Sequence, residues 1–302
     1  MKLARTAIDW GKLAPLRLHA QGVADGVYAG WHRSRRRGSG IEFGGHRAYV
    51  PGDDLRFIDR HALLRHGEPL VRQFETETDR TLCLLLDASA SMSFRSERGI
   101  ASKFAFAALL AAALAKVAVS GGDRVALSFI ARNPSNELAT SGGRQAFERV
   151  VGALESIEPS EDLHADRGAL ERAVVRIERR ANRGANVVVF SDLLDLPDGA
   201  LELLGGLAAR GRNLCLVRVL DPTEIEFPFT GPVHLRALER PTQVETDGAS
   251  ARADYLAALA ENERGLQQEL LARGGRLLRA SSGDDAIAIV RRILDALGGR
   301  PS

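Results

Sequence analysis

The stretch LLLDASASM (residues 84–92) decides the fold of this chain. A continuous apolar run is typical of an interior strand that is covered on both faces. The run ends at Asp87, and Ser89 and Ser91 follow at alternate positions. Because alternate residues of an extended backbone point the same way, a loop beyond the strand can direct one carboxylate and two hydroxyls toward one point. These residues are therefore a metal site, a catalytic turn or the polar end of a strand.

Strand and helix patterns alternate along the chain from about residue 80. Strands are predicted at 81–87, 123–130, 186–192, 213–221 and 276–281, with a short edge candidate at 136–140. Helices are predicted at 100–120, 144–157, 168–182, 198–211, 255–273 and 285–297. Such alternation with short links is typical of parallel βαβ units. We expect an α/β fold, a doubly wound, mostly parallel sheet with helices on both faces.

The first 79 residues lack this alternation and are predicted to form a separate N-terminal segment, residues 1–79, before the α/β domain of residues 80–302. The segment is expected to hold a helix at 7–29 and an extended arm rich in Arg and Gly. Four arginines lie between residues 33 and 37. They suit a phosphate or nucleic-acid patch, a docking surface for an acidic partner, or a solvated arm. Nucleic-acid binding is disfavoured because no aromatic residues are interleaved for base stacking.

Composition is that of a folded soluble protein, with 45% hydrophobic and 26% charged residues. The net charge of +2 gives no general attraction to polyanions. Cys83 and Cys215 each lie inside an apolar run, which favours two buried thiols over a disulfide. The N-terminus lacks the apolar core of a secretory signal, and the longest apolar stretch, residues 104–115, is too short to span a bilayer. We expect a cytoplasmic protein without membrane insertion.

A second acid, Asp192, follows the predicted strand at 186–192. In a doubly wound sheet, ligands bind beyond the carboxyl ends of the strands, where Asp87 and Asp192 both lie. Oxygen ligands with little negative charge suit Mg²⁺ or Mn²⁺. An ion held by Asp87, Ser89, Ser91 and Asp192 would remain electrophilic enough to take an acidic side chain from a partner protein.

The pattern resembles the metal-ion-dependent adhesion site (MIDAS) of von Willebrand factor A domains, in which Asp-x-Ser-x-Ser follows the first strand and a Ser-Asp pair follows the fourth. The resemblance implies that Asp87, Ser89, Ser91 and Asp192 are the metal site. The family also has a Thr from a later loop, expected here before the helix at 168, and IEPSEDLHADRG (157–168) contains none. Possible replacements are Ser160, Glu161, Asp162 and Asp166. Whether a metal is held without the Thr stays open.

Sequence on either side of the motif is similar to the domain-of-unknown-function-58 family, bacterial proteins with a von Willebrand A-like domain. The similarity lies in residues 40–92, in SDLLD (191–195) and in DPTEIEFPFTGPVHL (221–235). Arg60 departs from the Trp that the family usually has. The resemblance implies an adaptor that works with a MoxR-type AAA+ ATPase in chaperone-like maturation of other proteins.

Enzyme classes are not supported by the motifs. A phosphatase of the haloacid dehalogenase kind needs a second acid two residues after the first, where this chain has Ser89. No phosphate-binding glycine loop and no Gly-x-Ser-x-Gly elbow is present. We predict a non-enzymatic protein-interaction adaptor, with no catalytic residues and no organic cofactor. The alternatives are a metal-dependent phosphohydrolase and an Arg-arm nucleic-acid binder.

Overall fold

The computed structural model describes residues 8–31, 42–48, 70–75, 80–131, 137–160, 168–194, 197, 199–238 and 242–298. The chain divides into two compact units. The main unit contains Met1–Tyr28 and Arg80–Ser302, and the second unit contains Ala29–Asp79.

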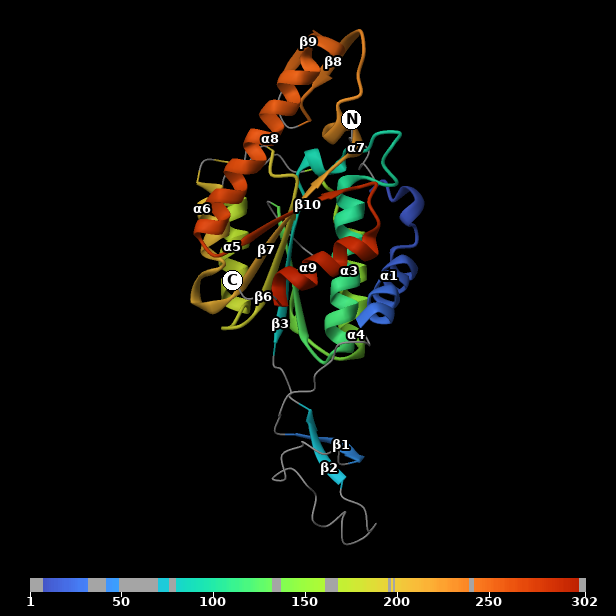
Figure 1. Ribbon diagram of the computed structural model, residues 1–302, viewed down its shortest axis with the longest axis vertical. Helices are drawn as coiled ribbons and strands as arrows, with labels where there is room; N and C mark the ends of the chain where they lie inside the picture. Colours follow the sequence, from blue (N-terminus) through green and yellow to red (C-terminus); the bar gives the residue numbers. More distant parts are fainter. Residues whose placement is uncertain are drawn as a thin grey trace, which may run out of the picture. The chain divides into compact units, whose positions relative to one another are not determined.

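A six-stranded sheet in the order β10-β7-β6-β3-β4-β5 forms the centre of the main unit (Figure 1). Its strands are β3 (Thr81–Asp87), β4 (Arg124–Ile130), β5 (Leu138–Ser141), β6 (Asn186–Ser191), β7 (Asn213–Leu220) and β10 (Arg276–Ser281). All neighbouring pairs are parallel except β4 and β5, which are antiparallel. The predicted doubly wound, mostly parallel sheet is confirmed, and the short edge candidate is β5.

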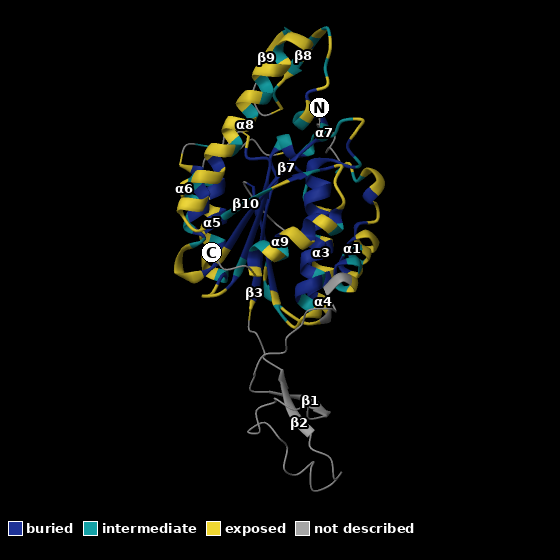
Figure 2. Cartoon of the chain, in the orientation of Figure 1, coloured by how far each residue is buried: buried dark blue, intermediate teal, exposed yellow. Residues whose placement is uncertain are grey.

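Both faces of the sheet are covered, which explains why β3 is a continuous apolar run. The helices that cover it are α1 (Leu16–Trp31), α3 (Lys103–Ser120), α4 (Arg144–Ser156), α5 (Gly168–Arg180), α6 (Ala200–Gly206), α8 (Gly248–Ala272) and α9 (Ala286–Gly298). Leu84 and Leu86 lie in the core under α1, α3, α4 and α9, whereas Cys83 and Leu85 lie in the core under α5, α6 and α8. The sheet and α3 are the most deeply buried elements in Figure 2.

Helix α3 is longer than its central apolar stretch. Its 18 residues are long and apolar enough to cross a membrane by length and composition, but 83% of them are buried inside the protein. The helix begins after Ser102, whose hydroxyl accepts a hydrogen bond from the Ala105 N–H at 3.2 Å. Its many alanines let the helix pack closely against the sheet.

Helix α1 belongs to the main unit up to Tyr28, so the predicted grouping of the first helix with residues 29–79 needs correction. Leu16, Ala20, Ala24 and Val27 are buried in the core that covers one face of the sheet. The helix begins at Leu16 because Pro15 lies just before it, after a short 3₁₀ turn, η1 (Gly11–Leu13). Burial of this apolar face, which the segment could not supply by itself, ties the helix to the α/β domain.

Tyr28 tests this attachment, because its hydroxyl donates a hydrogen bond to the Val117 carbonyl of α3 at 2.8 Å. Tyr28→Phe is expected to lower the free energy of unfolding by about 1 kcal/mol, the usual worth of such a bond. Urea denaturation of the full chain measures this loss. No change in the midpoint would show that this hydrogen bond does not stabilise the attachment.

The second unit contains two antiparallel strands, β1 (Glu42–Ala48) and β2 (Leu70–Glu75). The pairing has one irregularity, between Phe43 and Gly45. The arginines at 33–37 lie outside the described residues, so their predicted role stays a prediction.

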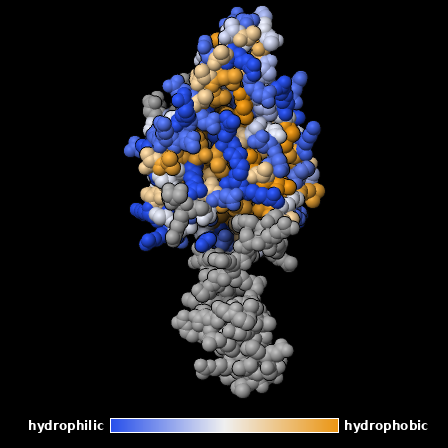
Figure 3. Space-filling model, viewed as in Figure 1, coloured by the Kyte–Doolittle hydropathy of each residue, from blue (hydrophilic) through white to orange (hydrophobic). Residues whose placement is uncertain are grey.

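The stretch after β7, where no element is predicted between residues 221 and 255, contains more structure than expected. It forms α7 (Pro222–Glu226) and an antiparallel hairpin of β8 (Pro232–Arg236) and β9 (Gln243–Asp247) before α8 begins at Gly248. Asp247 caps α8 by accepting a hydrogen bond from the Ser250 N–H. The hairpin lies at the end of the main unit near α7 (Figure 1), and hydrophilic and hydrophobic residues are interspersed over the face shown in Figure 3.

Candidate metal and docking site

Asp87 is the last residue of β3 and Asp192 comes directly after β6, and because these strands are parallel neighbours both acids lie at the same edge of the sheet. The pairing of β3 with β6 places Leu86 beside Phe190, and the Ser191 hydroxyl donates to Asp87 Oδ2 at 2.6 Å. Asp87 and Asp192 are only 1% and 2% exposed. The structure therefore brings both predicted acids to the same edge, and Ser191, next to Asp192 in the chain, forms a hydrogen bond with Asp87.

Ser89 and Ser91 complete a group that we call the carboxyl-edge site, defined as Asp87, Ser89, Ser91 and Asp192. The Ser89 N–H donates to Asp87 Oδ1 at 2.8 Å, which fixes the turn, and the Ser89 and Ser91 hydroxyls share a hydrogen bond with their oxygens 3.1 Å apart. Ser91 also forms a hydrogen bond with Asp192. Ser89 is buried whereas Ser91 is half-buried, so the site meets the solvent on the Ser91 side.

The backbone after Asp192 is held in an uncommon conformation. Leu193 has φ 55°, in the left-handed region, without being glycine. Its N–H donates to the Ser191 hydroxyl at 3.0 Å, and the Leu194 N–H donates to Asp192 Oδ1 at 3.2 Å. These bonds hold the turn, and strain of this kind is found preferentially at functional sites.

Of the four residues proposed to replace the missing Thr, the structure describes only Ser160. Ser160 is exposed beyond α4, and no hydrogen bond joins it to the carboxyl-edge site among the residues that the structure describes. Glu161, Asp162 and Asp166 lie outside the described residues. The third hydroxyl of the expected ligand set thus stays unassigned.

Lys103 is the functional residue that the sequence reasoning missed. Its ammonium group lies 2.8 Å from Asp192 Oδ2 and 2.7 Å from Glu224 Oε1, and its side chain is 1% exposed. A signal was available: Lys103 is one of four lysines in the chain, and it stands at the N-terminus of a helix, where the helix dipole disfavours positive charge. A lysine placed there needs a strong partner.

Glu224 is held on the short helix α7 by a capping box. Its Oε2 accepts the Asp221 N–H at 2.7 Å, while Asp221 Oδ1 accepts the Thr223 N–H at 2.8 Å. The Tyr255 hydroxyl of α8 donates to the Glu224 carbonyl at 2.8 Å. Lys103 therefore links the end of β6 to α7.

The pKa values of the acids are shifted in opposite directions. Burial, and next to it the charge of Asp192, raises the pKa of Asp87 to about 7, although hydrogen bonds from Ser191 and Ser89 act against the shift. Burial alone would also raise the pKa of Asp192, but Lys103 outweighs it and lowers that pKa. Burial raises the pKa of Glu224 despite Lys103, and the two carboxylates raise the pKa of Lys103 against its own burial.

A second buried cation lies next to the site. Arg218 of β7 is 0% exposed, and its Nε donates to the Asp192 carbonyl at 3.0 Å. Its Nη1 and Nη2 have no hydrogen-bond partner within the described part of the chain. Burial lowers the pKa of Arg218, opposed by the charges of Glu263 and Asp192. Lys103 and Arg218 thus balance the buried acids around Asp192.

The donor set fits a small divalent ion. Adjacent ligands of an octahedral Mg²⁺ at 2.0–2.1 Å are separated by about 3 Å, and the Ser89 and Ser91 oxygens are 3.1 Å apart. No group of three His, Cys, Asp or Glu residues suited to a metal occurs among the described residues. Any ion at the edge would therefore depend on the two serine hydroxyls.

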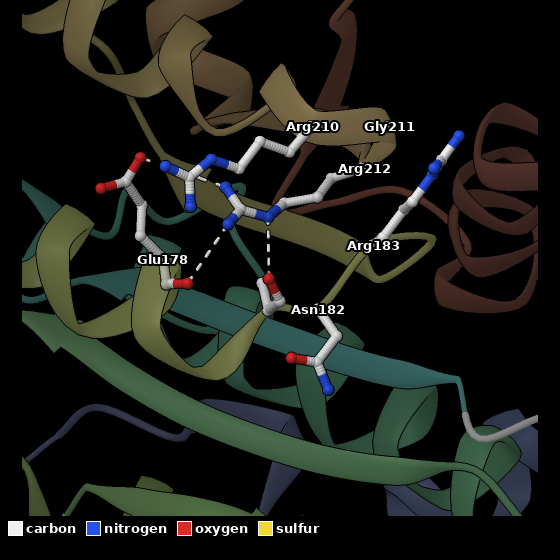
Figure 4. Close-up of a pocket in the computed structure, with 7 residues that line it drawn as sticks. Glu178, Asn182, Arg183, Arg210, Gly211 and Arg212 are labelled. Carbon is white, nitrogen blue, oxygen red and sulfur yellow. Dashed lines mark hydrogen bonds and ion pairs between the residues drawn. The ribbon is translucent and has the colours of Figure 1, made fainter.

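A separate hollow lies at the opposite ends of the strands. It measures about 570 Å³ and is lined by Glu178, Ala181, Asn182, Arg183, Arg210, Gly211 and Arg212. In Figure 4 the guanidinium groups of Arg210 and Arg212 lie beside each other near Glu178, while Arg183 points away. The Arg212 side chain donates to the carbonyls of Ala181 and Glu178. This hollow contains no residue of the carboxyl-edge site.

The family described as "Protein of unknown function DUF58" matches residues 45–265. The chain belongs to the DUF58 family. The match includes residues of both compact units. A relative of this DUF58 chain is the uncharacterized protein Rv1480 of Mycobacterium tuberculosis, which is 28% identical over 297 residues, 97% of this chain and 92% of the relative.

Solved structures similar to this DUF58 chain include BatB, a conserved hypothetical protein of Bacteroides thetaiotaomicron. The TM-score is 0.45 at 16% identity, over 72% of this chain and 98% of BatB. The SpRpn10 VWA domain has a TM-score of 0.42 at 10% identity, over 74% of this chain and 99% of that domain. The fold of the DUF58 chain is defined by its own strand order, not by these distant likenesses.

Proposed function

We propose that this DUF58 protein is a non-enzymatic interaction module that holds Mg²⁺ or Mn²⁺ at the carboxyl-edge site and binds an acidic side chain of a partner protein through the ion. The observation that carries the proposal is the 3.1 Å separation of the Ser89 and Ser91 hydroxyls at the sheet edge. Ser89 and Ser91 would contact the ion. Asp87 and Asp192 would serve it directly or through water.

Neutral ligands give the proposed ion its affinity for a partner. The hydroxyls of Ser89 and Ser91 contribute no charge, so the ion keeps most of its own positive charge. An ion with few anionic ligands attracts an outside carboxylate strongly, especially beside a buried surface where water screens poorly. Leu194, which is 43% exposed next to Asp192, offers an apolar contact for the same partner.

Catalysis is not part of the proposal. A phosphohydrolase of the expected kind needs an acid two residues after Asp87, and Ser89 stands there. A MoxR-type AAA+ ATPase is the proposed partner, on the strength of the family resemblance. We place this partnership in the cytoplasm, where such an ATPase has access to ATP.

Ser91→Ala tests the docking site, because it removes one proposed ion ligand on the solvent side. Capture of a purified MoxR-type ATPase from the same organism is expected to weaken at least tenfold, and EDTA should have the same effect on the unmodified protein. Ser93→Ala is the matched control, since the Ser93 hydroxyl donates to the Ala90 carbonyl within the same turn. Capture that is indifferent to both Ser91→Ala and EDTA would refute the proposed docking mode.

A further inference from the structure

The ammonium group of Lys103 already forms an ion pair with one acid of the carboxyl-edge site, Asp192. It lies 2.8 Å from Asp192 Oδ2, in a side chain that is 1% exposed, so water does not screen its charge. A divalent ion served by Asp192 would face this charge at close range. Two cations that bind the same carboxylate repel each other, so each weakens the binding of the other.

We propose that Lys103 is a tethered cation that competes with the divalent ion for Asp192 and thereby keeps the metal affinity of the site low. This inference rests on the proposed function, because it concerns the same ion. It differs from that proposal in assigning a role to a residue outside the ligand set. The site then stays neutralised when no ion is present, and binds the ion when the ammonium leaves Asp192.

Glu224 provides the second position for the ammonium group. Its Oε1 lies 2.7 Å from Lys103 Nζ, and its Oε2 is fixed by the Asp221 N–H. A lysine side chain has flexible methylene groups and three rotatable donors, so it can give up Asp192 while it keeps Glu224. Glu224 therefore retains the ammonium when the ion takes Asp192.

Contacts of α7 make this exchange sensitive to the neighbouring elements. Tyr255 of α8 donates to the Glu224 carbonyl, and Asp221 Oδ2 accepts the Ser96 N–H at 3.0 Å. Ser96 follows the turn that carries Ser89 and Ser91. A partner that shifts α7 would shift Glu224, and with it the ammonium group and the metal affinity.

Mn²⁺ binding by the full chain tests the inference, with free Mn²⁺ measured by electron paramagnetic resonance. Lys103→Met combined with Glu224→Gln removes the tethered cation and one of its two acids together. This double variant is expected to bind Mn²⁺ at least tenfold more tightly than the unmodified protein. Lys116→Met is the matched control: Lys116 lies on the same helix, over the Phe147 ring at 5.3 Å, and its loss should leave Mn²⁺ affinity unchanged.

Two further variants separate the outcomes. Ser91→Ala added to the double variant should abolish the tight binding, and tight binding that survives it would place the ion elsewhere and overturn the inference. Glu224→Gln alone confines the ammonium to Asp192, so Mn²⁺ affinity should fall several-fold even if the double variant does not fold. An unchanged or higher affinity of Glu224→Gln would overturn the inference.

Equal Mn²⁺ affinity of the unmodified protein and the double variant would overturn the competition and leave the proposed metal site intact. Absence of Mn²⁺ binding by every variant, each shown to be folded by its circular dichroism melting curve, would overturn the metal site and the competition together.

Discussion

Lys103→Met is expected to lower the free energy of unfolding by about 3–5 kcal/mol in the absence of metal, the usual result of leaving a buried charge without its partner. The substitution leaves the carboxylates of Asp192 and Glu224 close together, where Lys103 Nζ lay 2.8 and 2.7 Å from them. Both are largely buried, at 3% and 19% side-chain exposure, so water cannot replace the ammonium. The loss is large because the two acids then repel each other.

Urea denaturation in EDTA measures this loss, with Lys116→Met as the control on the same helix. Adding Glu224→Gln to Lys103→Met removes one of the two unpaired charges, so part of the lost stability should return. The unmodified protein, the two single variants Lys103→Met and Glu224→Gln, and the double variant form a double-mutant cycle. This cycle isolates the coupling free energy between Lys103 and Glu224. A loss no larger than that of Lys116→Met would show that the buried ion pairs contribute nothing.

The unmodified protein is expected to lose stability relative to Asp87→Asn as the pH rises. The pKa of Asp87 is raised from 3.8 to about 7 in the folded protein, chiefly by burial. The folded state therefore binds a proton that the unfolded state releases between these values, and a higher pH favours unfolding in that window. Each pH unit there changes stability by about 1.4 kcal/mol, so the difference between the two chains should grow by about 2–3 kcal/mol from pH 5 to pH 7.

The shifted pKa values of Asp192 and Glu224 do not account for this difference in stability between pH 5 and pH 7. The pKa of Asp192 is lowered, so its stabilisation is lost only as the pH falls below its ordinary value of 3.8. The raised pKa of Glu224 acts in the same direction as that of Asp87, but Glu224 is present in both chains. Chemical denaturation in EDTA at several pH values provides the measurement, with Asp254→Asn on the exposed side of α8 as the control. A difference that does not change between pH 5 and pH 7 would contradict the raised pKa.

The sequence predicted those residues of the site whose position depends only on the strand that precedes them. Asp87 ends β3 and Asp192 follows β6, and the apolar runs of both strands are recognisable because both faces of a parallel strand are buried. Parallel strands end at a common edge, so neighbouring strands bring their terminal residues together. Ser89 and Ser91 follow from the spacing within a single turn.

Elements without a strong pattern were not predicted. The hairpin β8–β9 is largely exposed, so it lacks the apolar alternation that marks a buried strand. Five-residue α7 is too short to show a helical period, and it depends on the capping box of Asp221 and Glu224. The first helix was predicted, but its attachment to the α/β domain depends on apolar contacts with distant elements.

The sequence by itself determined the doubly wound sheet and the polar residues at its carboxyl edge, because burial on two faces and alternation with helices are local patterns of residue type. Only the tertiary structure decided that Lys103 neutralises Asp192. That ion pair joins residues 89 positions apart, and the pair with Glu224 joins residues 121 positions apart. The choice of partner for a buried charge depends on which loops meet in three dimensions, and no periodicity along the chain records that.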